Sequence, residues 1–350
     1  MIGRLLVVLT TLFVTDGMTA RAHHSLASID DETTTVNEGT HPSLARAQAP
    51  VPAMPAKPDS PEVQALIAKA KTTGGAMWAT EAHFFCEAPR ANSASDPVIV
   101  PTKIFDNVYA IGNVGTTVYV VQTSDGLLMI DSMGAAQVET DLLPGFRKLG
   151  LDPAQVKIIV AGHGHADHVG GSPYMQNRFG SKVYVSAADW NVIENPPAGR
   201  QGAPPQVWPK RDQVLTEGQP VILGDLRVMP VAIPGHTPGS MGFIFPVKDN
   251  GRTHMAALYG GTVLTPGPIS DEGLATYLKS VAHFKEETTR AKVDVEIQNH
   301  PLMDPIQLKL DKLAARRPGD PNPFVVGQEN YQKFLDVMSL CTQVNIARRK

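Results

Sequence analysis

The sequence has little of several things, and each shortage argues against a class of protein. Only two of its 350 residues are cysteine, so it is not a small fold held together by several disulfides. It has no long run of lysine and arginine and its net charge is −3, so we expect no nucleic-acid partner. Charged residues make up 19% and hydrophobic residues 42%, which is typical of a globular protein with a sizeable core.

Long apolar segments are also lacking near the start of the chain. The run Leu5–Val14 is too short to cross a bilayer, which needs about 20 apolar residues. Arg4 precedes this run and Ala20-Arg21-Ala22 follows it, as in a signal peptide with its cleavage site. We therefore predict that residues 1–22 are a signal peptide cleaved near Ala22, that the protein is periplasmic or secreted, and that it has no stable membrane anchor. An uncleaved segment lying in the membrane interface is the alternative.

The two cysteines are Cys86 and Cys341. Export would permit a disulfide between them, which would tie the N-terminal arm to the C-terminal helix. Two cysteines so far apart in the sequence can equally be separate buried thiols, so the sequence leaves both alternatives open.

The rest of the chain divides into a leader and one catalytic domain. Residues 23–60 are rich in proline and alanine and show little apolar periodicity, which predicts a flexible leader. The domain spans residues 61–350, where Ser60 and Pro61 predict the start of a helix over residues 61–71. Strand patterns follow at 108–111, 117–122, 127–130, 156–160, 182–185, 220–223, 226–231, 241–246, 255–259 and 293–297. Helix patterns occur at 134–149, 170–179, 271–287, 305–316 and 327–347.

The order of these elements predicts the fold class. Strands joined by hairpins are followed by strands alternating with helices, and this succession occurs twice. It favours an α/β protein with two mixed sheets packed between outer helices.

The strongest local signal is the segment Gly162–His168, which reads Gly-His-Gly-His-Ala-Asp-His and follows the apolar strand at 156–160. Three histidines and an aspartate within six residues are costly to bury unless they share a cation. Their spacing does not suit one face of a helix, but on a glycine-containing loop the side chains can converge. Imidazole and carboxylate are ligands that Zn²⁺ prefers, so we predict a zinc site here.

This motif and three others resemble the metallo-β-lactamase superfamily over residues 100–345. Leu128-Met129-Ile130-Asp131 resembles the earlier family strand that ends in a supporting aspartate. Pro234–Ser240 and Asn299-His300-Pro301 resemble the two later ligand loops. The resemblance implies the four-layer αβ/βα sandwich of that family.

The resemblance also implies two zinc ions per chain and a role for Asp131 in supporting the ligands. One zinc would be bound by His163, His165 and His236, and the other by Asp167, His168 and His300. Taken without the resemblance, His236 and His300 could instead be turn or core residues.

One departure discriminates within the superfamily. Thioesterases and lactonases of this family place a metal-bridging aspartate in a Gly-Asp-Thr segment, whereas here Gly261 stands at that position. The chain therefore most resembles the third subclass of metallo-β-lactamases, which lacks a bridging carboxylate. That subclass often has serines near Thr262 and Leu264 that hold the substrate carboxylate. Thr262 could donate such a hydrogen bond and is our candidate substrate contact, but Leu264 cannot.

The implied function is hydrolysis of the amide bond of β-lactams by zinc-bound hydroxide, and therefore antibiotic resistance. Asp167 would orient the nucleophile and is our candidate catalytic residue. The substrate would be a small molecule. The alternatives are another hydrolase on the same scaffold, namely a lactonase or thioesterase, and an exported zinc-binding protein without turnover.

Overall fold

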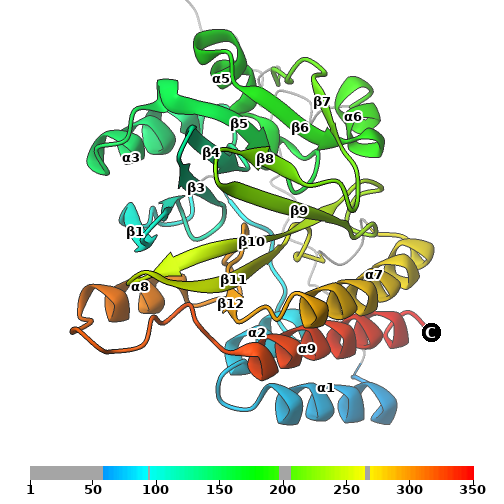
Figure 1. Ribbon diagram of the computed structural model, residues 1–350. Coiled ribbons are helices and arrows are strands. Elements are labelled where there is room, and N and C mark those ends of the chain that lie inside the picture. The colour runs from blue at the N-terminus through cyan, green and yellow to red at the C-terminus, as the bar shows by residue number, and fades with distance from the viewer. Residues whose placement is uncertain (1–57, 94, 197–205, 265–268) are drawn as a thin grey trace, which may run out of the picture. The chain divides into compact units, whose positions relative to one another are not determined.

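The structure is a computed structural model that describes residues 58–93, 95–196, 206–264 and 269–350. The predicted signal peptide and all but the last three residues of the predicted leader lie outside the described residues. The described residues form one compact unit, built from two mixed sheets and the helices that cover them (Figure 1).

The first sheet has seven strands in the order in which they occur along the chain. Strands β1 to β4 are antiparallel, and β4 to β7 run parallel. Their bounds are β1 Thr102–Phe105, β2 Val108–Gly112, β3 Thr117–Thr123, β4 Gly126–Ile130, β5 Val156–Val160, β6 Lys182–Ser186 and β7 Gln213–Leu215. Because β4 and β5 are parallel, their carboxyl-terminal ends lie side by side at the same end of the sheet.

The second sheet has five strands in the order β12-β11-β10-β9-β8. Its strands are antiparallel except for β12, which pairs parallel with β11. Their bounds are β8 Val221–Leu223, β9 Leu226–Ala232, β10 Met241–Asp249, β11 Arg252–Tyr259 and β12 Val295–Glu296.

The helices lie on the outer faces of the two sheets (Figure 1). Helices α3 (Leu143–Lys148), α5 (Ser172–Phe179) and α6 (Ala187–Glu194) pack on the seven-stranded sheet, where Phe146 and Trp190 are fully buried. Helices α7 (Asp271–Arg290) and α9 (Gln328–Ala347) pack on the five-stranded sheet. A separate core that includes Val160 and Phe243 lies between the sheets. The predicted layer order, helices outside two mixed sheets, is confirmed.

An N-terminal arm packs against α9 on the outside of the five-stranded sheet. It consists of α1 (Pro61–Gly74) and α2 (Ala79–Cys86). Helix α1 begins as predicted, because the side chain of Ser60 accepts a hydrogen bond from the backbone N–H of Val63. A disulfide joins Cys86 at the end of α2 to Cys341 in α9, which settles the alternative that the sequence left open.

Several helical segments differ from prediction. The segment predicted as one helix at 134–149 is a π-helical turn at Val138–Leu142 followed directly by α3, in which Pro144 lies in the first turn. Helices α2 and α6 were not predicted. A single-turn helix, α4 (Ala166–Val169), forms within the histidine-rich motif, and α8 (Ile306–Ala314) follows the last ligand loop. None of the helices in the described ranges is long and apolar enough to cross a membrane.

Candidate metal centre

Ligand-bearing loops from both sheets meet at one edge of the molecule. The loop after β5 carries His163 and His165, and α4, which follows directly, carries Asp167 and His168. From the other sheet come His236, in the loop between β9 and β10, and His300, after β12. Close approach of the two sheets depends on Gly162, since a Cβ atom there would lie only 3.0 Å from the Cα of Gly260. All six predicted ligands are therefore brought to one place.

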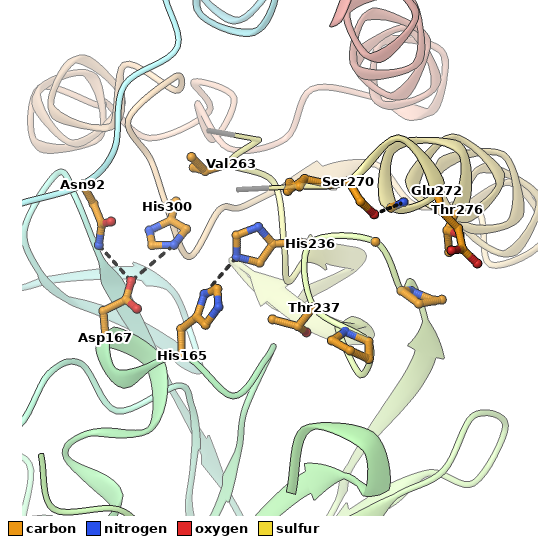
Figure 2. Close-up of a pocket in the computed structure, with 15 residues that line it drawn as sticks. Asn92, His165, Asp167, His236, Thr237, Val263, Ser270, Glu272, Thr276 and His300 are labelled. Carbon is orange, nitrogen blue, oxygen red and sulfur yellow. Dashed lines mark hydrogen bonds and ion pairs between the residues drawn. The ribbon is translucent and has the colours of Figure 1, made fainter. Parts of the chain in front are cut away.

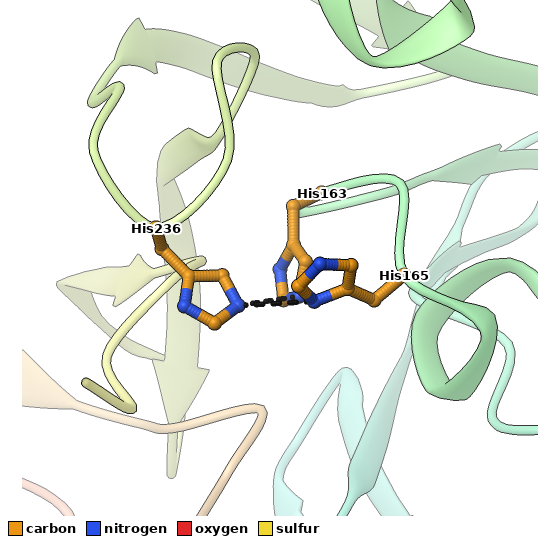
Figure 3. Close-up of side chains that lie close together, drawn as sticks. All are labelled: His163, His165 and His236. Carbon is orange, nitrogen blue, oxygen red and sulfur yellow. Dashed lines mark hydrogen bonds between the residues drawn. The ribbon is translucent and has the colours of Figure 1, made fainter. Parts of the chain in front are cut away.

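His163, His165 and His236, here called the three-histidine group, point toward one another (Figure 3). The Nε2 atom of His236 lies 3.1 Å from Nε2 of His163 and 3.2 Å from Nδ1 of His165. His163 is fully buried, whereas His165 is at the exposed edge of the group. One nitrogen from each ring is thus available to a single ion.

Asp167, His168 and His300, here called the second group, lie beside the three-histidine group. The Nε2 atoms of His168 and His300 are 2.8 Å apart, and Oδ2 of Asp167 lies 3.2 Å and 3.4 Å from them. Nitrogens of His163, His168 and His300 also lie within 4.8 Å of one another, so His163 borders both groups.

Asp131, which follows β4 directly, contacts the second group through His168. Its Oδ2 contacts Nδ1 of His168 at 2.7 Å and accepts a hydrogen bond from the Asn299 side chain, while its Oδ1 accepts one from the Gly162 backbone. The backbone of Asp131 has φ of 62°, an unfavourable conformation for a residue other than glycine. Such strain persists where surrounding contacts fix the residue, and it often marks a functional site.

Backbone carbonyls fix two further histidines. Nδ1 of His163 lies 2.6 Å from the carbonyl oxygen of Gly260, and Nδ1 of His300 lies 2.6 Å from that of Gly115. A carbonyl can only accept, so each Nδ1 carries the proton and each Nε2 has a free lone pair. This is the pattern in which a metal-ligating histidine donates its other ring N–H to a supporting acceptor.

The protonation of most of these side chains suits metal binding. Burial lowers the pKa of His236 to about 3 and that of His300 to about 4, and it holds the pKa of His163 well below its usual value. Against the opposing effect of burial, Asp167 and Asp131 raise the pKa of His168 to about 10. A divalent ion would replace the proton that these carboxylates favour there.

The donor set fits a divalent metal. Nδ1 of His168 and Nδ1 of His300 both face hydrogen-bond acceptors, so in each neutral ring Nδ1 carries the proton and Nε2 carries a lone pair. The two Nε2 atoms are 2.8 Å apart, so their lone pairs face each other. That arrangement is repulsive unless a proton or a cation lies between the rings. Imidazole nitrogens with one carboxylate oxygen are the ligands that zinc favours.

A pocket of about 610 Å³ opens over both groups (Figure 2). Its floor includes His165, Asp167, His236 and His300. Its walls include Val263, Ile269, and Ser270, Glu272 and Thr276 from the start of α7. This volume is within the range of small-molecule sites, which is about 300–1,000 Å³.

Two contacts in this region had no sequence signal. Asn92, in the segment after α2, donates a hydrogen bond from Nδ2 to Oδ2 of Asp167 at 2.8 Å (Figure 2). Asp189 in α6 accepts hydrogen bonds from the backbone of Gly164 and the side chain of Thr237, beside the three-histidine group.

The structure does not place Thr262 in the pocket. Its side chain is fully buried, and within the described residues its Oγ1 has no hydrogen-bond partner. The wall at this point is formed by the next residue, Val263. The threonine hydroxyl follows the end of β11 and points into the protein, which the sequence alone could not reveal.

Gly261 leaves no space for a side chain between the ligand loops. A Cβ atom there would lie 2.8 Å from Cβ of His236 and 3.1 Å from Oγ of Ser240. Real Cβ atoms essentially never approach other atoms under 3.0 Å. The His236 loop is thus packed against a glycine at the position where the sequence departs from the Gly-Asp-Thr pattern.

Comparison with known proteins finds similarity to one superfamily over part of the chain. The family model of the metallo-β-lactamase superfamily matches residues 111–249. Hydroxyacylglutathione hydrolase GloC of Haemophilus influenzae is 31% identical over 125 residues, 33% of this chain and 57% of that protein. Ribonuclease J of Mycoplasma pneumoniae is 38% identical over 81 residues, 21% of this chain and 14% of that protein. The chain thus spans less than two thirds of the length of either curated relative.

Solved structures match over more of the chain. BJP-1, a subclass B3 metallo-β-lactamase of Bradyrhizobium japonicum, has 26% identity and a TM-score of 0.59, covering 69% of this chain and 92% of that one. The FEZ-1 metallo-β-lactamase of Legionella gormanii has 23% identity and a TM-score of 0.59, covering 71% and 94%.

Proposed function

We propose that the chain is a zinc-dependent hydrolase that opens the amide bond of β-lactams, because residues 111–249 match the metallo-β-lactamase superfamily model and the chain has the metallo-β-lactamase fold. The observation that carries this proposal is the convergence of the three-histidine group and the second group, with His165, Asp167, His236 and His300 on the floor of one open pocket. Each group offers three donors of the kinds that zinc prefers, so we propose two zinc ions per chain.

The bound zinc and the protein side chains would have distinct roles in the reaction. Bound zinc supplies a Lewis acid that lowers the pKa of water from 15.7 to about 7. Asp167 lines the pocket, and its contacts with Asn92, His168 and His300 are all made by Oδ2. Among the described residues none contacts Oδ1, which would orient the attacking water. In the reaction a C–O bond forms, the C–N bond of the ring breaks, and the ring nitrogen gains a proton.

The choice of β-lactam over other substrates is supported by Gly261 and by similarity to BJP-1. The tight packing at Gly261 leaves no room for the bridging aspartate of the thioesterase-like members. The similarity to GloC, a hydroxyacylglutathione hydrolase, favours thioester hydrolysis as the second candidate.

The test is hydrolysis of nitrocefin, a lactone and a glutathione thioester by the same preparation, with and without a chelator. We expect nitrocefin to have the highest kcat/KM, chelation to abolish turnover and zinc to restore it. His236→Ala should lose most of the activity, because it removes one of three donors. His283→Ala is the matched control, since His283 is exposed and pairs with Glu217 in a different part of the described fold. Faster cleavage of the thioester, or retained activity in zinc-loaded His236→Ala, would refute the proposal.

We also propose that the protein acts outside the cytoplasm. The disulfide between Cys86 and Cys341 supports export, because disulfides persist mainly in oxidising compartments. Fractionation of expressing cells and the mass of the purified chain would test this. A full-length chain recovered with the cytosol would contradict it.

A further inference from the structure

Asp189 is a buried carboxylate that neither metal group contains. It lies in the first turn of α6, directly after β6, and is fully buried. The N-cap residue Ser186 accepts a hydrogen bond from the backbone N–H of Asp189, which fixes this turn. The carboxylate itself accepts hydrogen bonds from the loops that carry the metal ligands.

Its oxygens bind two different loops. Oδ2 accepts hydrogen bonds from the backbone N–H of Gly164 at 2.7 Å and from Oγ1 of Thr237 at 2.7 Å. Oδ1 accepts one from the backbone N–H of Gly239 at 2.8 Å. Gly164 lies between His163 and His165, and Thr237 follows His236 directly. One side chain therefore bonds both loops that supply the three-histidine group.

The surroundings suit a carboxylate. Three donors face it, which matches the acceptor capacity of an ionised aspartate. Burial raises the pKa of Asp189, and the bonds from Thr237, Gly164 and Gly239 oppose that rise.

Glycines allow both loops to approach this side chain. A Cβ atom at Gly239 would lie 2.0 Å from Oγ of Ser186 and 2.7 Å from Oδ1 of Asp189. A Cβ atom at Gly164 would lie 3.2 Å from Cβ of Asp189. Glycine at position 239 is therefore required by this packing, and glycine at position 164 leaves only a tight fit for a larger residue.

We propose that Asp189 is a positioning residue for the three-histidine group, setting the separation of the His163–His165 loop from the His236 loop and thereby the affinity of that group for zinc. The first loop follows the seven-stranded sheet and the second belongs to the five-stranded sheet. The backbone N–H of Met241 donates a hydrogen bond to the carbonyl oxygen of Gly162 at the base of the two loops, and Asp189 joins them beside the ligands themselves. The inference rests on metal binding by this group and not on β-lactam turnover.

The test measures zinc binding directly. Apo-protein is titrated with zinc in competition with a chromophoric chelator, and His236→Ala identifies which binding step belongs to the three-histidine group. We expect Asp189→Asn to weaken that step by about 10- to 100-fold, the usual effect of losing a group that orients a ligand, and to leave the other step within about threefold. The cobalt-substituted variant should also show an altered visible spectrum, which a purely structural role would not predict.

Asp294→Asn is the matched control. Asp294 accepts a hydrogen bond from the backbone of Met255 and pairs with His254, but it contacts neither metal group. Its substitution should reduce stability without changing either zinc step. Thr237→Val, which removes one donor and keeps the volume, should weaken the same step as Asp189→Asn by a smaller factor, and it decides the question if Asp189→Asn does not fold.

The inference is overturned if Asp189→Asn, or Thr237→Val where the first variant does not fold, binds zinc at the three-histidine step within twofold of the wild type. A wild-type protein that shows no zinc step sensitive to His236→Ala would instead refute the proposed metal site. The two failures are therefore distinguishable.

Discussion

Removal of the disulfide between Cys86 and Cys341 should lower the free energy of unfolding by several kcal/mol without dismantling the active site. The perturbation is the double variant Cys86→Ala/Cys341→Ala, because both cysteines are almost fully buried and a reductant reaches them only when the protein opens. The bond links residues 255 positions apart, so it closes a loop that contains nearly the whole domain.

The magnitude follows from the size of that loop. Loop-closure entropy for about 255 residues gives about 5.5 kcal/mol at 25 °C, with about 2–5 kcal/mol typical of measured losses. The native contacts of the arm remain in the variant: the Trp78 and Phe334 rings have centroids 5.2 Å apart, and Arg348 donates a hydrogen bond to the carbonyl oxygen of Cys86. Most of the loss should therefore come from a less restricted unfolded chain.

Urea denaturation of the oxidised wild type and of the double variant is the assay. We expect a lower midpoint and a larger m-value for the variant, since its unfolded state exposes more surface. Reductant should move the wild-type curve toward that of the variant and leave the variant unchanged. A difference in unfolding free energy below about 1 kcal/mol, or two reactive thiols in the unfolded oxidised protein, would refute the reasoning.

Two further substitutions test the contacts of the arm. Asn92→Ala should reduce kcat/KM for the preferred substrate about tenfold, because it removes a hydrogen bond to the Asp167 carboxylate, and Asn92→Asp should be worse because like charges repel. Burial, with a smaller effect of the nearby Asp304, raises the pKa of Glu81 in α2 to about 8, from 4.5. The folded state therefore holds a proton that the unfolded state has released, and stability falls as pH rises between about 4.5 and 8. Denaturation of Glu81→Gln measured across this window should show a pH dependence of the unfolding free energy that is smaller by up to about 1.4 kcal/mol per pH unit. A difference between variant and wild type that does not change with pH would contradict the assignment.

Much of the fold could be predicted because local patterns and tertiary packing agree. Strand β5 was predicted with its exact bounds, since a short apolar run stands between polar segments. Helix α7 was predicted from its first residue, Asp271, where Ser270 caps it. Helix α2 was missed because its N-cap residue is Trp78, which makes no side-chain cap, and because it buries Glu81.

Other local departures have tertiary causes. Gly145 lies inside α3, and a Cβ atom there would lie 2.3 Å from a methyl group of Ile111. The glycine is therefore needed for close packing of α3 on β2, although glycine is a weak helix former. The local sequence pattern does not indicate the contact between Gly145 and Ile111, because these residues are far apart in the sequence.

The candidate site was predictable where several possible metal ligands lie close together in the sequence. Four of the six converging donors occur between residues 163 and 168, and the others lie in motifs that resemble a known family. Asn92 and Asp189 were missed because a single polar residue in a loop or a short helix has many possible roles. Asn92 meets Asp167 across 75 positions, and Asp189 meets Gly239 across 50. Only the folded chain shows these pairs.

Each group of donors takes its residues from the loops of both sheets. His163 and His165 belong to the half of the domain built on the seven-stranded sheet and His236 to the other half, and Asp167 and His168 are divided in the same way from His300. Each ion would therefore link the two halves of the domain in addition to its role in the reaction. Where metal is scarce, the halves would be held by their apolar interface and by hydrogen bonds such as those to Asp189 and Asp131, so that depletion would loosen the molecule at the place where substrate enters.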